Sequence, residues 1–241
     1  METIYTSGEY LKTTQTWHAE DSPWKANQII EIICNNHLQP KTIAEIGCGA
    51  GAIIDELSKK KSLIGTQFSG YDISPQAIEL AEQRASERIR FFREDLLSST
   101  NTEHFDVLLV IDVFEHIPDY MGFVEKCRAK AEYKIFHIPL DIHVSSVLRN
   151  AFIGGRYTLG HLHYFTADSA IATLKDTGHE IVDYFYTNAA FGLFKQHPSI
   201  KRAIANGPRW LFSKFSMRFT ARVFGGYSLL GVGKVRTSED S

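Results

Sequence analysis

The segment IAEIGCGAGAI, residues 43–53, joins an apolar run to alternating glycines, a pattern typical of loops that hold nucleotide-like ligands. Glycines after a strand let the backbone approach a ligand closely, and the helix that follows offers free N–H groups. Two patterns begin at Gly47: G-x-G-x-x-G/A, which ends at Ala52, and G-x-G-x-G, which ends at Gly51. The first is typical of dinucleotide binding and hydride transfer. The second would suit group transfer, so the glycines alone leave the chemistry open.

Acidic residues lie near these glycines and at the ends of the following strands. Asp72 lies 21 residues after Gly51, where a carboxylate can accept both hydroxyls of a ribose. Glu45 precedes the glycines in an apolar run, and a buried carboxylate is costly unless a cation or a donor meets it. It would repel a pyrophosphate and suit a ligand that carries an ammonium group and a sulfonium. Asp95 is placed to accept from an adenine amino group.

Short apolar runs that alternate with helical patterns must position these acids. Strands are expected at 42–47, 68–73, 89–95, 105–112, 133–139, 180–186 and 227–235, and helices from Pro23 and at 75–87, 119–131 and 167–178. Alternation of this kind predicts an α/β fold: an open, doubly wound, Rossmann-like sheet of seven strands with helices on both faces. The fourth strand then brings Asp112, Glu115 and His116 to its carboxyl end, where ligands of such sheets bind.

Four motifs, EIGCGAG, GYDISP, REDLL and DVFEHIPD, occur in an order and spacing that resembles the class I S-adenosylmethionine-dependent methyltransferases. The chain is most similar to bacterial small-molecule methyltransferases that share D-V-x-E-H-x-P-D with ubiquinone-pathway O-methyltransferases. The resemblance covers about residues 17–185. It implies strand order 3-2-1-4-5-7-6 with the last strand antiparallel. It also implies S-adenosyl-L-methionine as methyl donor and S-adenosyl-L-homocysteine as product.

The resemblance further implies which residues bind the donor. Glu45 and the glycines would line its methionine part, Asp72 its ribose, and Asp95 with Leu96 its adenine. The full expected set is Glu45, Gly47, Cys48, Gly49, Gly51, Asp72, Ile73, Ser74, Asp95, Leu96, Ile111, Asp112, His116 and His18. In related enzymes the segment before the glycine motif folds over the donor, which makes Trp17, His18 and Lys25 candidates for its carboxylate end. The alternative is an ordinary amphipathic helix with a tryptophan anchor.

Histidines after the fifth strand are the candidates for catalysis at the methyl acceptor. Methyl transfer needs nucleophile and methyl held in line, and a hydroxyl acceptor usually needs a base. We expect His161 or His163 to be that base, with His143 behind them. A metal site made from D-x-H at 141–143 and H-x-H at 161–163 is an alternative that we do not favour. Histidines that only anchor the loop are a further alternative.

Residues 189–226 lie between the last two strands and hold a basic, aromatic segment. Within 209–224, apolar residues recur every four positions beside a stripe of cations, which predicts one amphipathic helix. From Tyr184 to Ser238 there are nine lysines and arginines and no acid. The helix could pack on the core, form a lid over a greasy or anionic acceptor, or contact a membrane surface through 201–224.

The composition favours one domain, residues 1–241, with a helical cap at 1–36 and substrate-side insertions at 141–166 and 189–226. Three cysteines without C-x-x-C spacing and the lack of a signal peptide or long apolar run predict a soluble, cytoplasmic protein. A net charge of −2 and the absence of motifs for DNA methylation argue against nucleic acid. Oligomeric state is left open.

We therefore expect a methyltransferase that acts on an oxygen of a small or lipid-linked molecule, with a histidine as general base. N-methylation of a small molecule is the alternative within the class. A non-catalytic S-adenosylmethionine-binding protein and a nicotinamide-dependent oxidoreductase are alternatives from other classes, and the sequence does not name the acceptor because one fold hosts many acceptors.

Overall fold

The computed structural model describes residues 19–188 and 200–236, with side chains from residue 20 in the first segment and from residue 206 in the second. Trp17 and His18 lie outside the described residues, as do 1–18 of the expected cap and 189–199 of the second insertion. None of the helices in the described part of the chain is long and apolar enough to cross a membrane.

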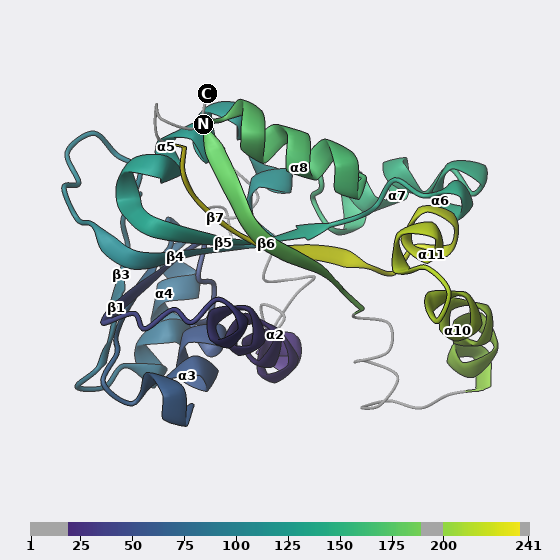
Figure 1. Ribbon diagram of the computed structural model, residues 1–241. Coiled ribbons are helices and arrows are strands. Elements are labelled where there is room, and N and C mark those ends of the chain that lie inside the picture. The colour runs from purple at the N-terminus through teal and green to yellow at the C-terminus, as the bar shows by residue number, and fades with distance from the viewer. Residues whose placement is uncertain (1–18, 189–199, 237–241) are drawn as a thin grey trace.

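One seven-stranded sheet forms the centre of the molecule (Figure 1). Its strands are β1 (Thr42–Ile46), β2 (Gln67–Tyr71), β3 (Ile89–Phe92), β4 (Phe105–Ile111), β5 (Ala131–Pro139), β6 (His179–Thr187) and β7 (Ser228–Val235). Their order is β3-β2-β1-β4-β5-β7-β6, and β7 runs antiparallel to both of its neighbours. The predicted fold class, strand order and antiparallel last strand are confirmed. The reversal between β1 and β4 opens a crevice at the carboxyl ends of the parallel strands.

Helices cover both faces of the sheet. They are η1 (Ala19–Asp21), α2 (Ser22–Asn35), α3 (Ala52–Ser58), η2 (Lys61–Leu63), α4 (Pro75–Ala81), η3 (Glu82–Arg84), η4 (Phe114–His116), α5 (Tyr120–Cys127), η5 (Arg128–Lys130), α6 (Val144–Leu148), α7 (Ala151–Thr158), α8 (Ala167–Asp176), α10 (Ile200–Ser213) and α11 (Met217–Phe224). In Figure 1, α2, α3 and α4 lie on one side of the sheet and α5 and α8 on the other.

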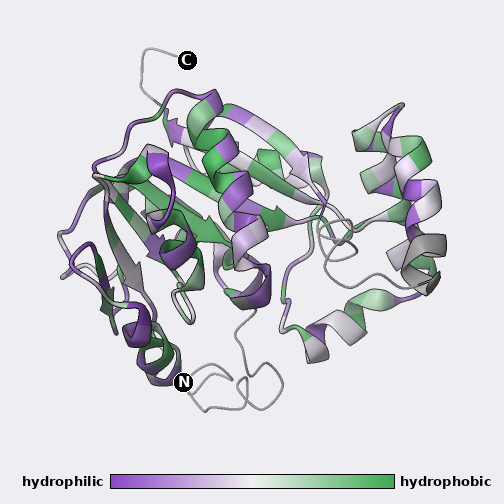
Figure 2. Ribbon diagram, turned by 90° about the horizontal axis from the view of Figure 1, so that it is seen from below, coloured by the Kyte–Doolittle hydropathy of each residue, from purple (hydrophilic) through white to green (hydrophobic). Residues whose placement is uncertain are grey.

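Two buried apolar clusters fix these layers. Ile29 of α2 and Ile54 of α3 belong to the cluster on one face, and Val124 of α5 and Ala170 of α8 to the cluster on the other. The central strand β4, FDVLLVI, is almost continuously apolar because both of its faces are covered, and Figure 2 shows hydrophobic strands at the centre of the sheet. The core therefore holds the ends of β1, β2 and β4 in fixed relative positions.

The positions at which helices begin were predicted from the sequence more accurately than the positions at which they end. Pro23 and Pro75 lie in the first turns of α2 and α4, and the Ser74 hydroxyl accepts from the Ala77 N–H. The helix expected over 75–87 ends as an α-helix at Ala81 and continues as the 3₁₀ turn η3. The helix expected over 119–131 likewise becomes η5 after Cys127. Such tightening is common in the last turn of a helix.

The single amphipathic helix expected over 209–224 is wrong, because the chain breaks it into α10 and α11. The N–H groups of Phe215 and Ser216 both donate to the Phe212 carbonyl, which closes α10. Ser216 then has an extended backbone, and its hydroxyl accepts from the Phe219 N–H at 3.1 Å. An N-capping serine starts a new helix at this point.

Candidate active site

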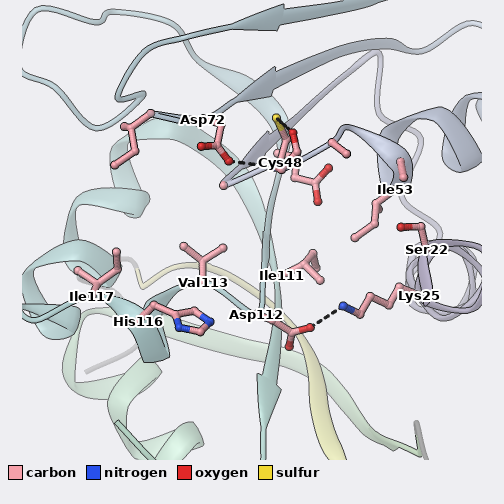
Figure 3. Close-up of a pocket in the computed structure, with 16 residues that line it drawn as sticks. Ser22, Lys25, Cys48, Ile53, Asp72, Ile111, Asp112, Val113, His116 and Ile117 are labelled. Carbon is pink, nitrogen blue, oxygen red and sulfur yellow. Dashed lines mark hydrogen bonds and ion pairs between the residues drawn. The ribbon is translucent and has the colours of Figure 1, made fainter. Parts of the chain in front are cut away.

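A cavity of about 200 Å³ opens at the carboxyl ends of β1, β2 and β4 (Figure 3). This is the edge at which open α/β sheets bind their ligands. The lining comes from the start of α2, the glycine loop, the end of β2 and the turn after β4. Its residues are Ser22, Lys25, Glu45, Gly47, Cys48, Gly49, Ala50, Ala52, Ile53, Asp72, Ile73, Ile111, Asp112, Val113, His116 and Ile117.

The glycine loop needs glycine at two positions for steric reasons. Gly47 has φ of +68°, and a Cβ added there would lie 2.9 Å from a Val113 methyl carbon. Gly51 has φ of +72°, and its added Cβ would lie 2.4 Å from the Phe91 ring. Positive φ and this crowding exclude larger residues. The Gly47 N–H donates to the Tyr71 carbonyl at 2.8 Å, so the loop is tied to the end of β2.

Glu45, near the end of β1, is the unusual group in this cavity. Its residue is 2% exposed, and Oε2 has no hydrogen-bond partner among the described residues. Burial raises its pKa to about 8, although the positive charge of Lys25 opposes the shift. A buried acceptor without a partner is costly, so this carboxyl group is set up to meet a donor or cation in the cavity.

Asp72 shapes the loop from the neighbouring strand. One carboxylate oxygen accepts from the Gly49 N–H at 2.9 Å and the other from the Ser74 N–H at 2.8 Å. Burial raises the pKa of Asp72, and these backbone donors oppose the increase. The side chain thus joins the glycine loop to the start of α4 and lines the cavity between them (Figure 3).

Asp112 links α2 to the inner strands through a chain of polar contacts. Its carboxylate lies 2.9 Å from Lys25 Nζ and 2.6 Å from His137 Nδ1, while His137 Nε2 lies 2.9 Å from the Thr187 hydroxyl. Burial disfavours the charged carboxylate, but His137 and Lys25 together hold the pKa of Asp112 below its usual range. Its φ of +54° is uncommon for a residue other than glycine. The lysine lying over this cavity is therefore anchored to its floor.

A second cavity, of about 220 Å³, adjoins the first and shares Lys25, Asp112 and His116 with it. Its other lining residues are Asp21, Trp24, His137, Pro139, Leu159, His161 and Ser228. Because the two cavities meet at three common side chains, a molecule in one would lie beside a molecule in the other.

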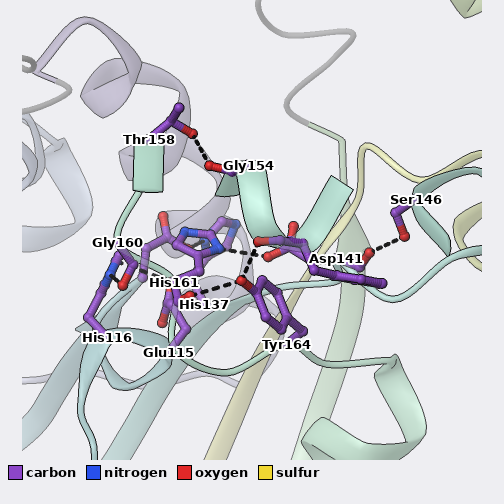
Figure 4. Close-up of polar contacts among 12 residues, drawn as sticks. Glu115, His116, His137, Asp141, Ser146, Gly154, Thr158, Gly160, His161 and Tyr164 are labelled. Atoms are coloured by element: carbon purple, nitrogen blue, oxygen red, sulfur yellow. Dashed lines mark hydrogen bonds and ion pairs between the residues drawn. The ribbon is translucent and has the colours of Figure 1, made fainter. Parts of the chain in front are cut away.

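The three candidate histidines have different surroundings. His161 Nδ1 lies 2.7 Å from an Asp141 carboxylate oxygen, and the residue lines the second cavity (Figure 4). His163 Nε2 lies 3.0 Å from the Ile117 carbonyl, and its ring packs against Tyr120. His143 is the N-cap of α6, where its Nδ1 accepts from the Ser146 N–H, and burial lowers its pKa. Of the three, His161 is the one that lines a cavity.

Glu115, His116 and His161 form the group of ligand-type side chains that lies closest together in the described residues. One ligand atom from each lies within 4.8 Å of the others. Glu115 is 1% exposed, and neither of its carboxylate oxygens has a hydrogen-bond partner in the part of the chain that the structure describes. Burial, together with the charge of Asp112, raises the pKa of Glu115. Carboxylate and imidazole ligands suit divalent transition metals. The metal site weighed from the sequence was made of residues 141–143 and 161–163 and did not include Glu115 or His116.

The part of the chain that matches a known protein family includes the glycine loop and the turn after β4. Residues 44–131 match a family described as Methyltransferase domain. The ubiquinone biosynthesis O-methyltransferase of Nitrosomonas europaea is 27% identical over 147 residues, which are 58% of this chain and 60% of that protein.

Residues 44–131 thus match a methyltransferase domain, and the chain is similar to class I S-adenosylmethionine-dependent methyltransferases.

Solved structures share the fold of this chain at low identity. Magnesium protoporphyrin IX methyltransferase from Synechocystis PCC 6803 superposes with a TM-score of 0.58 at 18% identity, covering 89% of this chain and 83% of that one. The N-methyltransferase NodS from Bradyrhizobium japonicum gives 0.57 at 17%, covering 88% and 86%. The chain spans about 60% of the length of the curated relatives it matches, so their similarity does not extend to whole proteins.

The fold brings most of the expected donor-binding residues to the first cavity. Those that line it are Glu45, Gly47, Cys48, Gly49, Asp72, Ile73, Ile111, Asp112 and His116. Gly51, Ser74, Asp95 and Leu96 are not among the lining residues. Asp95 is exposed and accepts from the Leu97 N–H, while the Leu96 side chain is buried in the core. The expected contacts of these two with adenine stay predictions.

Sequence reasoning missed several lining residues: Ser22, Ala50, Ala52, Ile53, Val113 and Ile117. Val113 and Ile117 stand within DVFEHIPD, between residues that the motif did assign. Their position next to Asp112 and His116 was a signal that they could form an apolar wall of the cavity. Ser22 had no such signal, because only packing of α2 against α3 brings it to the cavity.

Proposed function

We propose that this chain transfers a methyl group from S-adenosyl-L-methionine to an oxygen of a small or lipid-linked acceptor. The observation that carries the proposal is Glu45, a buried carboxyl group in the glycine-loop cavity whose Oε2 has no hydrogen-bond partner among the described residues. A carboxylate there suits the ammonium group of a methionine moiety and would repel a pyrophosphate. The Synechocystis structure holds bound S-adenosylhomocysteine, which supports the same ligand class.

The described residues fit the donor at both of its polar ends. Glu45 would accept from the ammonium group, and Lys25 would face the carboxylate once it exchanges its contact with Asp112. Asp72 lines the cavity at the end of β2, where it would accept from ribose hydroxyls. When bound, the donor supplies a methyl group on a positively charged sulfur. Gly51, Ser74, Asp95 and Leu96 would then act through the loop and strand ends that they support.

His161 is the proposed general base. Because Asp141 faces Nδ1, the imidazole can hold a proton there and leave Nε2 free to accept one from an acceptor hydroxyl. His161 lines the cavity that adjoins the donor cavity. His163 would anchor its loop through the Ile117 carbonyl, and His143 would cap α6. Of the three candidate histidines, only His161 is therefore proposed as the base.

Two alternatives remain specific enough to test. N-methylation is the first, because the Bradyrhizobium protein with the same fold is an N-methyltransferase. A non-catalytic protein that binds S-adenosylmethionine is the second.

Calorimetric titration of the full chain tests the donor assignment. S-adenosylhomocysteine should bind, and NAD should not, because its pyrophosphate would meet Glu45. NAD binding without S-adenosylhomocysteine binding would overturn the proposal. Mass spectrometry of cell extract incubated with the chain and isotopically labelled donor then finds the acceptor. A labelled C–O or C–N bond separates the two kinds of methylation, and donor binding without any labelled product would favour the non-catalytic alternative.

A further inference from the structure

Two segments of the chain expose large apolar side chains far in excess of scattered surface residues. On 144–159 these are Val144, Val147, Leu148, Ile153, Tyr157 and Leu159, and on 210–219 they are Trp210, Leu211, Phe212, Phe215, Met217 and Phe219. Leu148, Tyr157 and Phe215 are each more than 80% exposed. Gathered apolar side chains of this kind mark an interaction surface on a globular protein. We call them together the helical face.

The two segments belong to one surface. The Ser145 hydroxyl of α6 donates to the Phe224 carbonyl at the end of α11, and a Cβ added to Gly225 would meet the His143 ring at 2.0 Å. Phe212 stacks on Phe224 and packs on Phe219, which joins α10 to α11. Figure 1 shows α6, α7, α10 and α11 together at one side of the molecule. On that side in Figure 2, hydrophobic and hydrophilic residues alternate along the helices.

The charged residues of the two segments that form the helical face are all lysines and arginines. Neither 142–166 nor 184–238 contains an aspartate or glutamate. Arg149, Arg156 and Lys214 are exposed, and Lys214 Nζ lies 3.7 Å from the centre of the Trp210 ring. Arg218 and Arg222 share a single carboxylate, that of Asp168. Cations therefore outnumber acids across the whole face.

We propose that the helical face binds the surface of an anionic lipid bilayer. Aromatic and aliphatic side chains beside lysine and arginine are what an interfacial helix presents to lipid headgroups and the upper acyl chains. Each lysine or arginine near such a surface contributes about 1 kcal/mol of attraction. A second copy of the chain would bring two cationic faces together, which favours the bilayer over self-association. The described helices do not span a membrane, so the contact is peripheral.

The helical face also connects to the second cavity. Leu159 follows α7 and lines that cavity beside His161. The Tyr164 hydroxyl donates to the Phe152 carbonyl of α7 at 2.6 Å and lies 3.0 Å from the His161 carbonyl (Figure 4). A lipid-linked acceptor could enter from a bilayer at this point. This last step rests on the proposed methyl transfer, whereas binding to the bilayer does not.

Co-sedimentation of the full chain with vesicles tests the proposal. The chain should bind vesicles of phosphatidylglycerol mixed with phosphatidylcholine at low salt, and should bind pure phosphatidylcholine far more weakly. Raising the salt should release it, because exposed charges are screened. Failure to sediment with the anionic vesicles, or equal sedimentation with both kinds, would overturn the proposal.

Matched variants locate the contact. Lys214→Glu should weaken vesicle binding about 30-fold, because it removes one attraction and adds one repulsion of similar size. Arg90→Glu makes the same charge change on β3, an edge strand outside the helical face, and should change binding by less than about twofold. Phe215→Ser should also weaken binding about tenfold. Its control, Ile64→Ser, replaces an equally exposed side chain after η2 and should have no effect.

Two further measurements separate the outcomes. Titration with S-adenosylhomocysteine should be unchanged in all four variants, so loss of vesicle binding cannot be attributed to unfolding or to a failed donor site. Equal effects of Lys214→Glu and Arg90→Glu would overturn the location. Sedimentation equilibrium that shows a dimer in solution, dissociated by Phe215→Ser, would assign the helical face to a second copy and overturn the bilayer proposal.

Discussion

The first cavity, which we call the donor cavity, and the second cavity, beside His161, which we call the histidine cavity, are built in different ways. They share three lining side chains. The donor cavity is made largely by consecutive residues at the ends of β1, β2 and β4, and its key contacts join strand ends to backbone N–H groups. The histidine cavity instead brings together side chains from α2, β5, the loop before α8 and β7. Its contact between Asp141 and His161 spans a twenty-residue segment that holds α6 and α7. One cavity follows from local motifs, and the other depends on how distant segments pack.

The largest expected effect tests the histidine cavity. His161→Ala should lower turnover by about 10²–10⁴-fold, the range for loss of a general base, and should leave S-adenosylhomocysteine affinity unchanged. Turnover is measured as labelled methyl transferred to the acceptor identified by mass spectrometry. His163→Ala is the control, since that side chain contacts a backbone carbonyl. A greater loss in His163→Ala than in His161→Ala would reverse the assignment.

The second prediction tests the donor cavity. Asp72→Ala removes the carboxylate that we propose accepts from the ribose hydroxyls, and S-adenosylhomocysteine affinity should fall about 100-fold, since hydrogen bonds to a charged group are worth about 1.5–3 kcal/mol each. Asp176→Ala is the matched control: Asp176 is exposed at the end of α8 and outside the cavity lining, so affinity should change by less than about threefold. Calorimetry measures both affinities. Equal losses would overturn the assignment of Asp72 to the ribose.

These two regions also show how far the sequence could be interpreted. The family resemblance implied the strand order, whereas the glycine loop, Glu45 and Asp72 follow from motifs whose residues are close in the sequence. Their placement depends on strand ends, which parallel pairing fixes once the strands are recognised. Gly51 and Leu96 fall outside the cavity although the motifs include them, because Gly51 packs against Phe91 and Leu96 is buried in the core.

The histidine side could not be predicted to the same depth. Nothing in the spacing of His143, His161 and His163 shows that one caps a helix, one faces an aspartate and one contacts a carbonyl. Glu115 was noted only as part of the fourth strand's end, and its approach to His161 needs the loop at 159–163 to fold back over η4. These contacts are tertiary, so a pattern in one sequence does not encode them.

The third prediction concerns pH and Glu45. Because burial raises its pKa to about 8, the free protein holds a proton on Glu45 below that pH. Binding of a ligand ammonium group favours the ionised carboxylate, so S-adenosylhomocysteine affinity should rise by up to about tenfold per pH unit between about pH 6 and pH 8. Calorimetry at a series of pH values measures this slope. Glu45→Gln should flatten it, and an unchanged slope in that variant would assign the proton to another group.

The same group makes a prediction about the free protein. A folded pKa above the unfolded value means that the stability contributed by protonated Glu45 is complete below about pH 4.5 and is lost as pH rises through about 8. Urea denaturation of the unliganded chain should therefore show a falling midpoint over that range. In Glu45→Gln the fall should be smaller, and ligand should restore the midpoint in the wild-type chain above pH 8.

The smallest expected effect tests the helical face against the donor side. Ser216→Ala removes the N-cap of α11 and should lower the free energy of unfolding by about 1 kcal/mol, as Ser74→Ala should at α4 beside the donor cavity. Urea denaturation without ligand compares the two variants directly. If one continuous helix ran through 209–224, as the spacing alone predicts, alanine at 216 would favour it and stability would be unchanged or higher. A similar loss of unfolding free energy in both variants would show that the N-cap stabilises α11 as much as it stabilises α4. It would also confirm the break between α10 and α11, next to which Lys214 and Phe215 are exposed.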